Sequence, residues 1–247
     1  IMSNNSQYIY GIRAIQEAIE SGNDFHKIFL QKGLTSPLFK ALEGQIHDRK
    51  IPHSYVPVER LQRITTQNHQ GAIAEISEVG YADFEETIER ILQAKEHPMF
   101  LLLDGLTDVR NFGAILRTAS CTEVDAVIVP KQGMAPLNKD AIKTSAGAAF
   151  TLPVARVDHL KDAVYYLKSS GVQIVSATEK ADGHIYDVDF KKASAIIMGS
   201  EDIGIHPSLL KLSDSQAKLP MSGNIASLNV SVACGVFLYE AVRQRLD

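Results

Sequence analysis

Short apolar runs recur through the second half of the chain, and stretches with helical periodicity separate them. The runs lack the alternation of polar and apolar residues that marks a strand with one solvated face, so they predict strands buried on both faces of a parallel sheet. The stretches between them predict helices that cover this sheet. The predicted strands are residues 99–104, 126–129, 172–177, 195–198 and 217–219, and the predicted helices are 113–121, 158–169 and 206–212.

The N-terminal part of the chain alternates in the same way on a smaller scale. Ile12, Ile15 and Ile19 are spaced as on one face of a helix. Further strands and helices follow as far as residue 76, which predicts a small α/β domain. A polar loop at residues 65–71 precedes its last strand, and it is interpreted either as a simple turn or as a loop that contacts a substrate.

An acidic stretch separates the two parts. Residues 79–98 hold five Asp or Glu side chains against two Lys or Arg, and they account for most of the net charge of −4. Phe84 and Ile88 belong to one apolar stripe, so a helix is predicted at residues 83–95. The predicted parts are a small domain at 1–78, a linker with an acidic helix at 79–98, and a larger domain at 99–247.

Composition narrows the class of protein. The chain has 247 residues, 45% of them hydrophobic, which is enough for a sizeable core. It has no apolar run of about 18 residues and no signal-peptide pattern, so we expect a soluble protein that stays in the cytoplasm. Cys121 and Cys234 lie in apolar helical surroundings and are expected to be buried free thiols. The histidines are scattered without metal-ligand spacing, so no metal is expected, and the charge balance alone does not predict a nucleic-acid partner.

Polar residues lie where the predicted strands end, which is where parallel sheets bind ligands. The loop after the first strand contains Asn111, a candidate cap for the helix that carries Arg117. The loop after the fourth strand contains Glu201 between Gly199 and Gly204, which permit close backbone approach to a ligand. No Gly-x-Gly-x-x-Gly or Walker sequence follows a predicted strand, so the fingerprints of dinucleotide and P-loop sites are missing.

The last predicted strand leads through a turn at residues 222–224 into a long helix that ends near Arg245. Ser227 is the predicted N-cap of this helix, because its hydroxyl can accept a hydrogen bond from a first-turn amide. Asn229 then lies in the first turn, where an amide buried without a partner costs about 1–3 kcal/mol.

Each of these residues also has an ordinary structural explanation. Arg117 can be a solvated or ion-paired helix residue, Glu201 a loop carboxylate, and Asn111 a helix cap. Their coincidence at the ends of neighbouring strands favours a functional interpretation.

Three ordered motifs identify a family resemblance. They are Asn-Phe-Gly-Ala-Ile-Leu-Arg-Thr-Ala at residues 111–119, Met-Gly-Ser-Glu-Asp-Ile-Gly at 198–204, and Leu-Pro-Met-Ser-Gly-Asn-Ile-Ala-Ser-Leu-Asn-Val-Ser-Val-Ala at 219–233. In this order they resemble the motifs of the SpoU/TrmH family of RNA ribose 2′-O-methyltransferases, part of the SPOUT superfamily. The small domain, with Tyr-Gly-Ile-Arg-Ala-Ile at 10–15 and His-Gln-Gly at 69–71, resembles the family's ribosomal-protein-like (L30e-like) substrate-binding domain.

The resemblance implies an α/β fold in which the C-terminal parallel-sheet domain forms a deep trefoil knot. It implies S-adenosylmethionine as the cofactor, held in the knot by contacts with Gly199, Leu219 and Leu228, with Thr178 and Met221 as neighbours. It also implies a homodimer that packs through the knotted domain.

The resemblance also implies roles in the reaction. Arg117 has the central role, and Asn111, Glu201, Ser227 and Asn229 orient the arginine, the ribose and the cofactor. An arginine with a pKa above about 12 stays protonated in water. We therefore expect Arg117 to grip an RNA phosphate that helps to accept the proton.

Two positions depart from the family's pattern. Asp-Val-Arg at 108–110 stands where the family often has Asp-Pro, and Glu123 stands where a glycine is usual. Both lie outside the matched site residues, so they concern loop geometry more than activity.

The resemblance implies that the small domain grips folded RNA through phosphates and exposed bases. The candidate RNA contacts are Lys131, Lys139, Lys143, Arg110 and the loop with His69. The two-domain layout is most similar to enzymes that methylate a guanosine of 23S ribosomal RNA. Two alternatives stay open: methylation of transfer RNA or another ribosomal site, and a non-catalytic RNA-binding or ribosome-assembly factor of the same fold.

Overall fold

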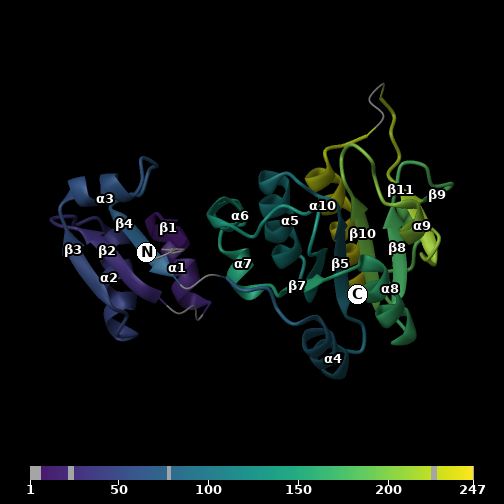
Figure 1. Ribbon diagram of the computed structural model, residues 1–247, viewed down its shortest axis with the longest axis horizontal. Coiled ribbons are helices and arrows are strands. Elements are labelled where there is room, and N and C mark those ends of the chain that lie inside the picture. Colours follow the sequence, from purple (N-terminus) through teal and green to yellow (C-terminus); the bar gives the residue numbers. More distant parts are fainter. Residues whose placement is uncertain (1–6, 22–24, 77–78, 224–226, 247) are drawn as a thin grey trace. The chain divides into compact units, whose positions relative to one another are not determined.

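The computed structural model describes residues 7–21, 25–76, 79–223 and 227–246, and the chain divides into two compact units (Figure 1). The first unit consists of the described residues of Ile1–Gly80 together with Leu137–Thr151. The second consists of the described residues of Tyr81–Pro136 and Leu152–Asp247. Residue 78 of the predicted domain boundary and residue 224 of the predicted turn lie outside the described residues.

A four-stranded mixed sheet, in the order β1-β4-β2-β3, forms the centre of the first unit. β4 pairs antiparallel with β1 and β2, and β3 pairs parallel with β2. The elements of this unit are β1 (Gln7–Tyr10), α1 (Ile12–Glu20), β2 (Phe25–Gln31), α2 (Pro37–Asp48), β3 (His53–Val56), α3 (Val58–Ile64), β4 (Ala72–Ile76), α6 (Lys139–Thr144) and α7 (Ala148–Thr151).

Two helices supply much of the core of the first unit. α1 buries the apolar face that its sequence predicts, and α2 packs beside it. Ser36 caps α2 by accepting a hydrogen bond from the Phe39 backbone nitrogen at 3.3 Å. Pro37 suits the first helical position, because the amide hydrogen that proline lacks would have no partner there.

Seven parallel strands, in the order β7-β6-β5-β10-β8-β11-β9, form the sheet among the described residues of the second unit. The predicted parallel α/β architecture is therefore confirmed. The strands are β5 (Met99–Asp104), β6 (Ala126–Pro130), β7 (Val154–Val157), β8 (Gln173–Ala177), β9 (Gly183–His184), β10 (Ser194–Gly199) and β11 (Ser215–Lys218). The helices are α4 (Phe84–Ala94), α5 (Val109–Cys121), α8 (Leu160–Ser169), α9 (Pro207–Leu210), α10 (Val230–Arg245) and the 3-10 turn Ile185–Asp187.

The central strands of this sheet are buried on both faces. Phe100 and Leu102 of β5 pack in one core with α4, α8 and α9. The alternate residues Leu101 and Leu103 are also fully buried and point to the opposite face. On that side of the sheet, α5 and α10 pack against each other. The continuous apolar runs of the sequence follow from this two-sided burial.

The order of the strands reverses beside β5. The chain leads from β5 to β6 on one side, whereas β10, from much later in the sequence, pairs with β5 on the other side. Open α/β sheets bind ligands at such a reversal, beyond the carboxyl ends of the strands. In the described part of the chain, no helix is long and apolar enough to cross a membrane.

Candidate active site

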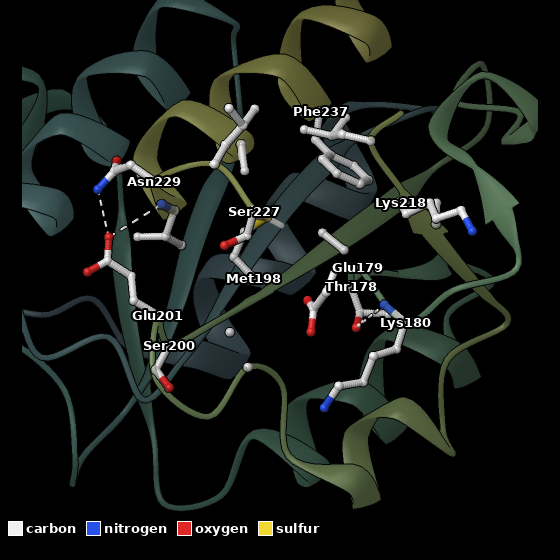
Figure 2. Close-up of a pocket in the computed structure, with 18 of the residues that line it drawn as sticks. Thr178, Glu179, Lys180, Met198, Ser200, Glu201, Lys218, Ser227, Asn229 and Phe237 are labelled. Carbon is white, nitrogen blue, oxygen red and sulfur yellow. Dashed lines mark hydrogen bonds between the residues drawn. The ribbon is translucent and has the colours of Figure 1, made fainter. Parts of the chain in front are cut away.

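A cavity of about 440 Å³ opens at the carboxyl ends of β8, β10 and β11 (Figure 2). The loop after β10 and the first turns of α10 complete its walls. This volume is in the range of about 300–1,000 Å³ that is usual for small-molecule sites. The residues from the strand ends are Ala177, Thr178, Met198, Gly199, Ala217, Lys218 and Leu219, and those from α10 and its approach are Ser227, Leu228, Asn229, Val230, Ala233 and Phe237.

The loop after β10 folds back onto the end of the strand. The Gly204 nitrogen donates to the Ser200 carbonyl at 3.0 Å, and Gly204 has a φ of 75°, which glycine adopts readily. A Cβ added to Gly199 would lie 2.1 Å from the Gly204 carbonyl carbon and 2.3 Å from the Ile205 nitrogen. Glycine is therefore required at the end of β10, and this tight turn holds Glu201 at the cavity wall.

Asn111, Glu201 and Asn229 form one hydrogen-bonded cluster beside the cavity. The Asn229 Nδ2 atom donates to Glu201 Oε1 at 2.6 Å and to Asn111 Oδ1 at 3.2 Å. The Asn111 Nδ2 atom donates to the same Glu201 oxygen at 3.0 Å. Glu201 Oε2 receives no hydrogen bond from a described residue. The carboxylate thus fixes two amides through charge-assisted bonds and keeps one oxygen available for a further donor.

The start of α10 differs from the prediction. Asn229 is the N-cap instead of Ser227, because its Oδ1 atom accepts from the Ser231 backbone nitrogen at 3.0 Å. The helix begins at Val230 and ends at Arg245, so its predicted end is confirmed. An asparagine side chain can cap with its oxygen and still donate with its nitrogen. Asn229 does both, which fixes the cluster to the first turn of the helix.

The predicted capping role of Asn111 is wrong. Asp108 is the N-cap of α5, and its Oδ1 atom accepts from the backbone nitrogens of Arg110 at 2.6 Å and Asn111 at 3.0 Å. A carboxylate at this position also interacts favourably with the positive end of the helix dipole. Because Asp108 satisfies the helix start, the Asn111 side chain is available to Glu201.

Every residue predicted to contact the cofactor lines the cavity: Gly199, Leu219, Leu228, Met221 and Thr178. Thr178 is buried, and its backbone nitrogen donates to the Ala217 carbonyl of the neighbouring strand at 2.9 Å. Leu228 and Met221 are 41% and 39% exposed, so their apolar side chains are open to a ligand. The assignment of these residues as cofactor contacts stays a prediction.

Arg117 lies outside this arrangement within one chain. It does not line the cavity, and its exposed side chain makes no hydrogen bond or ion pair with a described residue. It lies six positions after Asn111, about 9 Å along the axis of α5 and on a different side of the helix. It shares its helix face with Arg110, seven positions earlier.

Sequence reasoning missed a charged pair on the cavity wall, Glu179 and Lys180. The signal that could have found them is their place directly after the end of β8 at Ala177. The same signal marks Glu201, two residues after the end of β10 at Gly199.

The two cysteines are both free, as predicted, but only one is buried. Cys234 is buried within α10, and burial raises the pKa of its thiol to about 12. Cys121 is exposed, which corrects the prediction, because it is the last residue of α5 and projects away from the core. Among the described residues, no three His, Cys, Asp or Glu side chains gather into a metal site.

Comparisons with known proteins place this arrangement in a family. A model described as the SpoU rRNA Methylase family matches residues 98–239. The chain belongs to the SpoU rRNA methylase family. A second model, described as RNA 2′-O ribose methyltransferase substrate binding, matches residues 8–82.

Relatives of similar length agree with this SpoU assignment. A Bacillus subtilis (strain 168) protein named putative TrmH family tRNA/rRNA methyltransferase YacO is 30% identical over 244 residues, 99% of this chain and 98% of the relative. The 23S rRNA (guanosine-2′-O-)-methyltransferase RlmB of Vibrio parahaemolyticus is 36% identical over 249 residues, 98% of each chain.

Solved structures share the SpoU fold. A crystal structure of an RNA 2′-O ribose methyltransferase has a TM-score of 0.82 at 25% identity and covers 99% of this chain and 91% of its own. The SpoU methyltransferase AviRb from Streptomyces viridochromogenes, in complex with AdoMet, has a TM-score of 0.81 at 24% identity, with 98% and 91% coverage.

Proposed function

We propose that this SpoU-family protein transfers a methyl group from S-adenosylmethionine to the ribose 2′-hydroxyl of an RNA nucleotide. The observation that carries the proposal is that Glu201 and Asn229 belong both to the cavity wall and to the polar cluster. A methyl donor in the cavity would lie against groups that can orient a hydroxyl nucleophile. Alignment of two reactants in this way is a large part of what an enzyme contributes to such a displacement.

The cavity fits the cofactor chemically. Leu219 and Leu228 give an apolar wall that suits a purine ring, and Met221 extends it. Gly199 and Thr178 present backbone and hydroxyl groups from two neighbouring strand ends. When bound, S-adenosylmethionine supplies an electrophilic methyl group on a positively charged sulfur.

The polar cluster has a defined task in this proposal. Asn111 and Asn229 hold Glu201 through its Oε1 atom, and Glu201 Oε2 accepts a hydrogen bond from the ribose hydroxyl. Ser227, on the cavity wall, orients the cofactor. Arg117 grips an RNA phosphate, and the phosphate helps to accept the proton because the guanidinium stays protonated.

The role of Arg117 has a direct test. Arg117→Ala should lower methyl transfer below detection while cofactor affinity stays within about threefold. Arg90→Ala, an exposed arginine on α4, is the matched control and should retain wild-type turnover. Near-normal turnover of Arg117→Ala contradicts the assignment.

The proposed substrate is a guanosine of 23S ribosomal RNA, which also accords with the cytoplasmic location expected from the sequence. Support comes from the Vibrio parahaemolyticus relative, which is named for this reaction. Transfer RNA is the second candidate, because the Bacillus subtilis relative is named for either RNA. Methylation maps of 23S and transfer RNA from strains with and without the gene would separate the two.

The first unit is the proposed RNA-binding unit, and two predicted RNA contacts lie together in it. The Lys143 Nζ atom donates to Oε1 of Gln67, in the same loop as His69, at 2.7 Å. Lys131 differs, because Asp158 forms an ion pair with it at 2.9 Å. Replacing Lys143 and Lys139 by Ala should weaken RNA binding about tenfold and lower its salt dependence.

Lys131→Ala is the matched control for that experiment, because its charge is already compensated. It should change RNA affinity by less than about twofold. If both variants bind RNA equally well, the first unit does not grip RNA through this surface.

A homodimer is the proposed assembly, and an exposed stripe on α10 supports it. Val232, Val236 and Tyr239 are 52%, 38% and 56% exposed and share one face of the helix. Contiguous apolar surface of this kind is typical of interfaces. In sedimentation velocity, Val236→Asp should convert the dimer to a monomer. The control Tyr165→Asp, on α8, should leave the dimer intact. A wild-type protein that sediments as a monomer would contradict the proposal.

The deep trefoil knot predicted for the second unit is also a proposal. The end of α10 lies against distant segments, because the Arg245 guanidinium donates to the carbonyls of Phe190, His97 and Lys192 at 2.7–3.0 Å. If the unit is knotted, pulling on it near both ends should give a contour length shorter than that of a linear chain of the same number of residues. A contour length equal to that of a linear chain would exclude it.

A further inference from the structure

We propose that Glu179 and Lys180 bind the amino-acid end of S-adenosylmethionine, Glu179 through its α-ammonium group and Lys180 through its α-carboxylate. The inference rests on the proposed function and assigns the part of the cavity that binds the zwitterionic amino-acid group of the cofactor. Both residues line the cavity directly after β8.

The backbone of this pair is held in place by its neighbours. Thr178 and Ala181, which flank the pair, are only 9% and 4% exposed. The Thr178 nitrogen donates to the Ala217 carbonyl at 2.9 Å, and the Ala181 nitrogen donates to the Thr178 carbonyl at 3.2 Å. The Lys180 nitrogen donates to Thr178 Oγ1 at 3.3 Å. The turn therefore positions two charged side chains without using either of them.

The side chains themselves are available to a ligand. Both are exposed, and neither makes a side-chain hydrogen bond or ion pair with a described residue. Figure 2 shows the Glu179 carboxylate directed toward the middle of the cavity and the Lys180 side chain on the same side. The Lys218 amine points away from the cavity in the same view. A ligand that engages Glu179 and Lys180 breaks no internal bond of the protein.

The cavity has a charged wall and an apolar wall, and their chemistry indicates which end of the cofactor lies against each. An α-amino acid carries an ammonium and a carboxylate on one carbon, so it requires an acceptor and a cationic donor side by side. Glu179 and Lys180 provide this pair on one wall. The adenosine end carries no charge and suits the apolar wall that includes Leu219, Leu228 and Phe237.

The test compares two ligands that differ in the amino-acid end. S-adenosylhomocysteine has the whole skeleton without the reactive methyl group, and 5′-methylthioadenosine lacks the amino acid. Lys180→Gln and Glu179→Gln, measured by calorimetry, should each weaken S-adenosylhomocysteine about tenfold, the loss expected for one charge-assisted bond at an exposed site. The affinity for 5′-methylthioadenosine should change by less than about twofold. Lys161→Gln, at an exposed lysine of α8 that does not line the cavity, is the matched control and should bind both ligands as the wild type does.

The outcomes separate this inference from the proposed function. Equal weakening of both ligands would place the pair at the adenosine end, and unchanged binding of S-adenosylhomocysteine would remove it from the site; either result overturns the inference. A wild-type protein that binds S-adenosylhomocysteine but not 5′-methylthioadenosine would support it, because binding would then depend on the amino-acid end. Failure of the wild type to bind S-adenosylhomocysteine or S-adenosylmethionine would overturn the proposed function itself.

Discussion

Two helices of the second unit end in the same hydrogen-bonded motif with different residues at its left-handed position. After α5, the Val124 nitrogen donates to the Ala119 carbonyl at 2.9 Å, and Glu123 between them has a φ of 56°. After α8, the equivalent bond is 3.0 Å long, and Gly171 has a φ of 81°. This is the Schellman arrangement, in which glycine is favoured. We predict that Glu123→Gly stabilises the protein and that Gly171→Ala destabilises it.

The size of the effect follows from the backbone. A left-handed conformation costs a residue with a Cβ about 1–2 kcal/mol. Glycine loses about 0.5–1 kcal/mol more conformational entropy on folding than alanine does. The net gain for Glu123→Gly is therefore about 0.5–1 kcal/mol. A Cβ on Gly171 would meet nothing within 4 Å. Gly171→Ala should therefore lower the free energy of unfolding by about the same amount, through the cost of the left-handed conformation alone.

Scanning calorimetry of the full chain is the assay, because two units need not unfold in one transition. Gly171→Ala identifies the transition of the second unit by lowering its midpoint, and Glu123→Gly should raise that midpoint by about 1–4 °C. Lys50 has a φ of 54° in the same motif after α2, so Lys50→Gly should raise the transition of the first unit. A lower midpoint for Glu123→Gly would refute the reasoning.

Three further predictions concern the site and the last helix. Gly199→Ala should abolish cofactor binding and lower the melting temperature, because its Cβ would lie 2.1 Å from backbone; binding retained in calorimetry contradicts this. Glu201→Gln keeps an acceptor for the 2.6 Å bond from Asn229 and should slow methyl transfer about tenfold. Glu201→Ala removes the acceptor and should slow it at least about a hundredfold. Equal rates of methyl transfer in the two variants would contradict the proposed role of the hydrogen-bonded cluster. A hydrogen bond from Arg243 lowers the pKa of the buried Glu240 carboxyl. The ionised carboxyl therefore stabilises the folded protein fully above the unfolded pKa of glutamate, about 4.3, and this stabilisation disappears as the pH falls through the lower folded pKa. Arg243→Met should reduce this acid-side loss in urea unfolding measured from about pH 7 to pH 3, and an unchanged pH dependence would reject the role of the pair.

The sequence predicted the strands that are buried on both faces and the edge strand β3, and it missed the other edge strands, β1, β7 and β9. β5 and β10 are continuous apolar runs because helices cover both sides of them. β7 contains Arg156 and lies at one edge of its sheet, and β9 has two residues, so neither gives a run that stands out. β1 has four residues and exists because β4 pairs with it, which is not a local signal.

The site shows the same division between local and distant signals. Asn111 and Glu201 were found because each lies in the segment that follows a predicted strand, and Asn229 because it follows the predicted helix cap Ser227. Their shared hydrogen bonds join residues 90 and 118 positions apart, and no local pattern encodes such a distance. Ser227 was preferred as the cap because a serine before an apolar run is a common start. The structure uses Asn229, because one amide can serve the helix and the cluster together.

The central claim is the reaction, and transfer of labelled methyl from S-adenosylmethionine to purified 23S and transfer RNA tests it most directly. Nuclease mapping would then locate any 2′-O-methyl nucleotide. We predict label on the ribose of a single 23S guanosine. Label on transfer RNA would retain the reaction and change the substrate. No label on either RNA, nor on assembling ribosomal particles, would contradict the account.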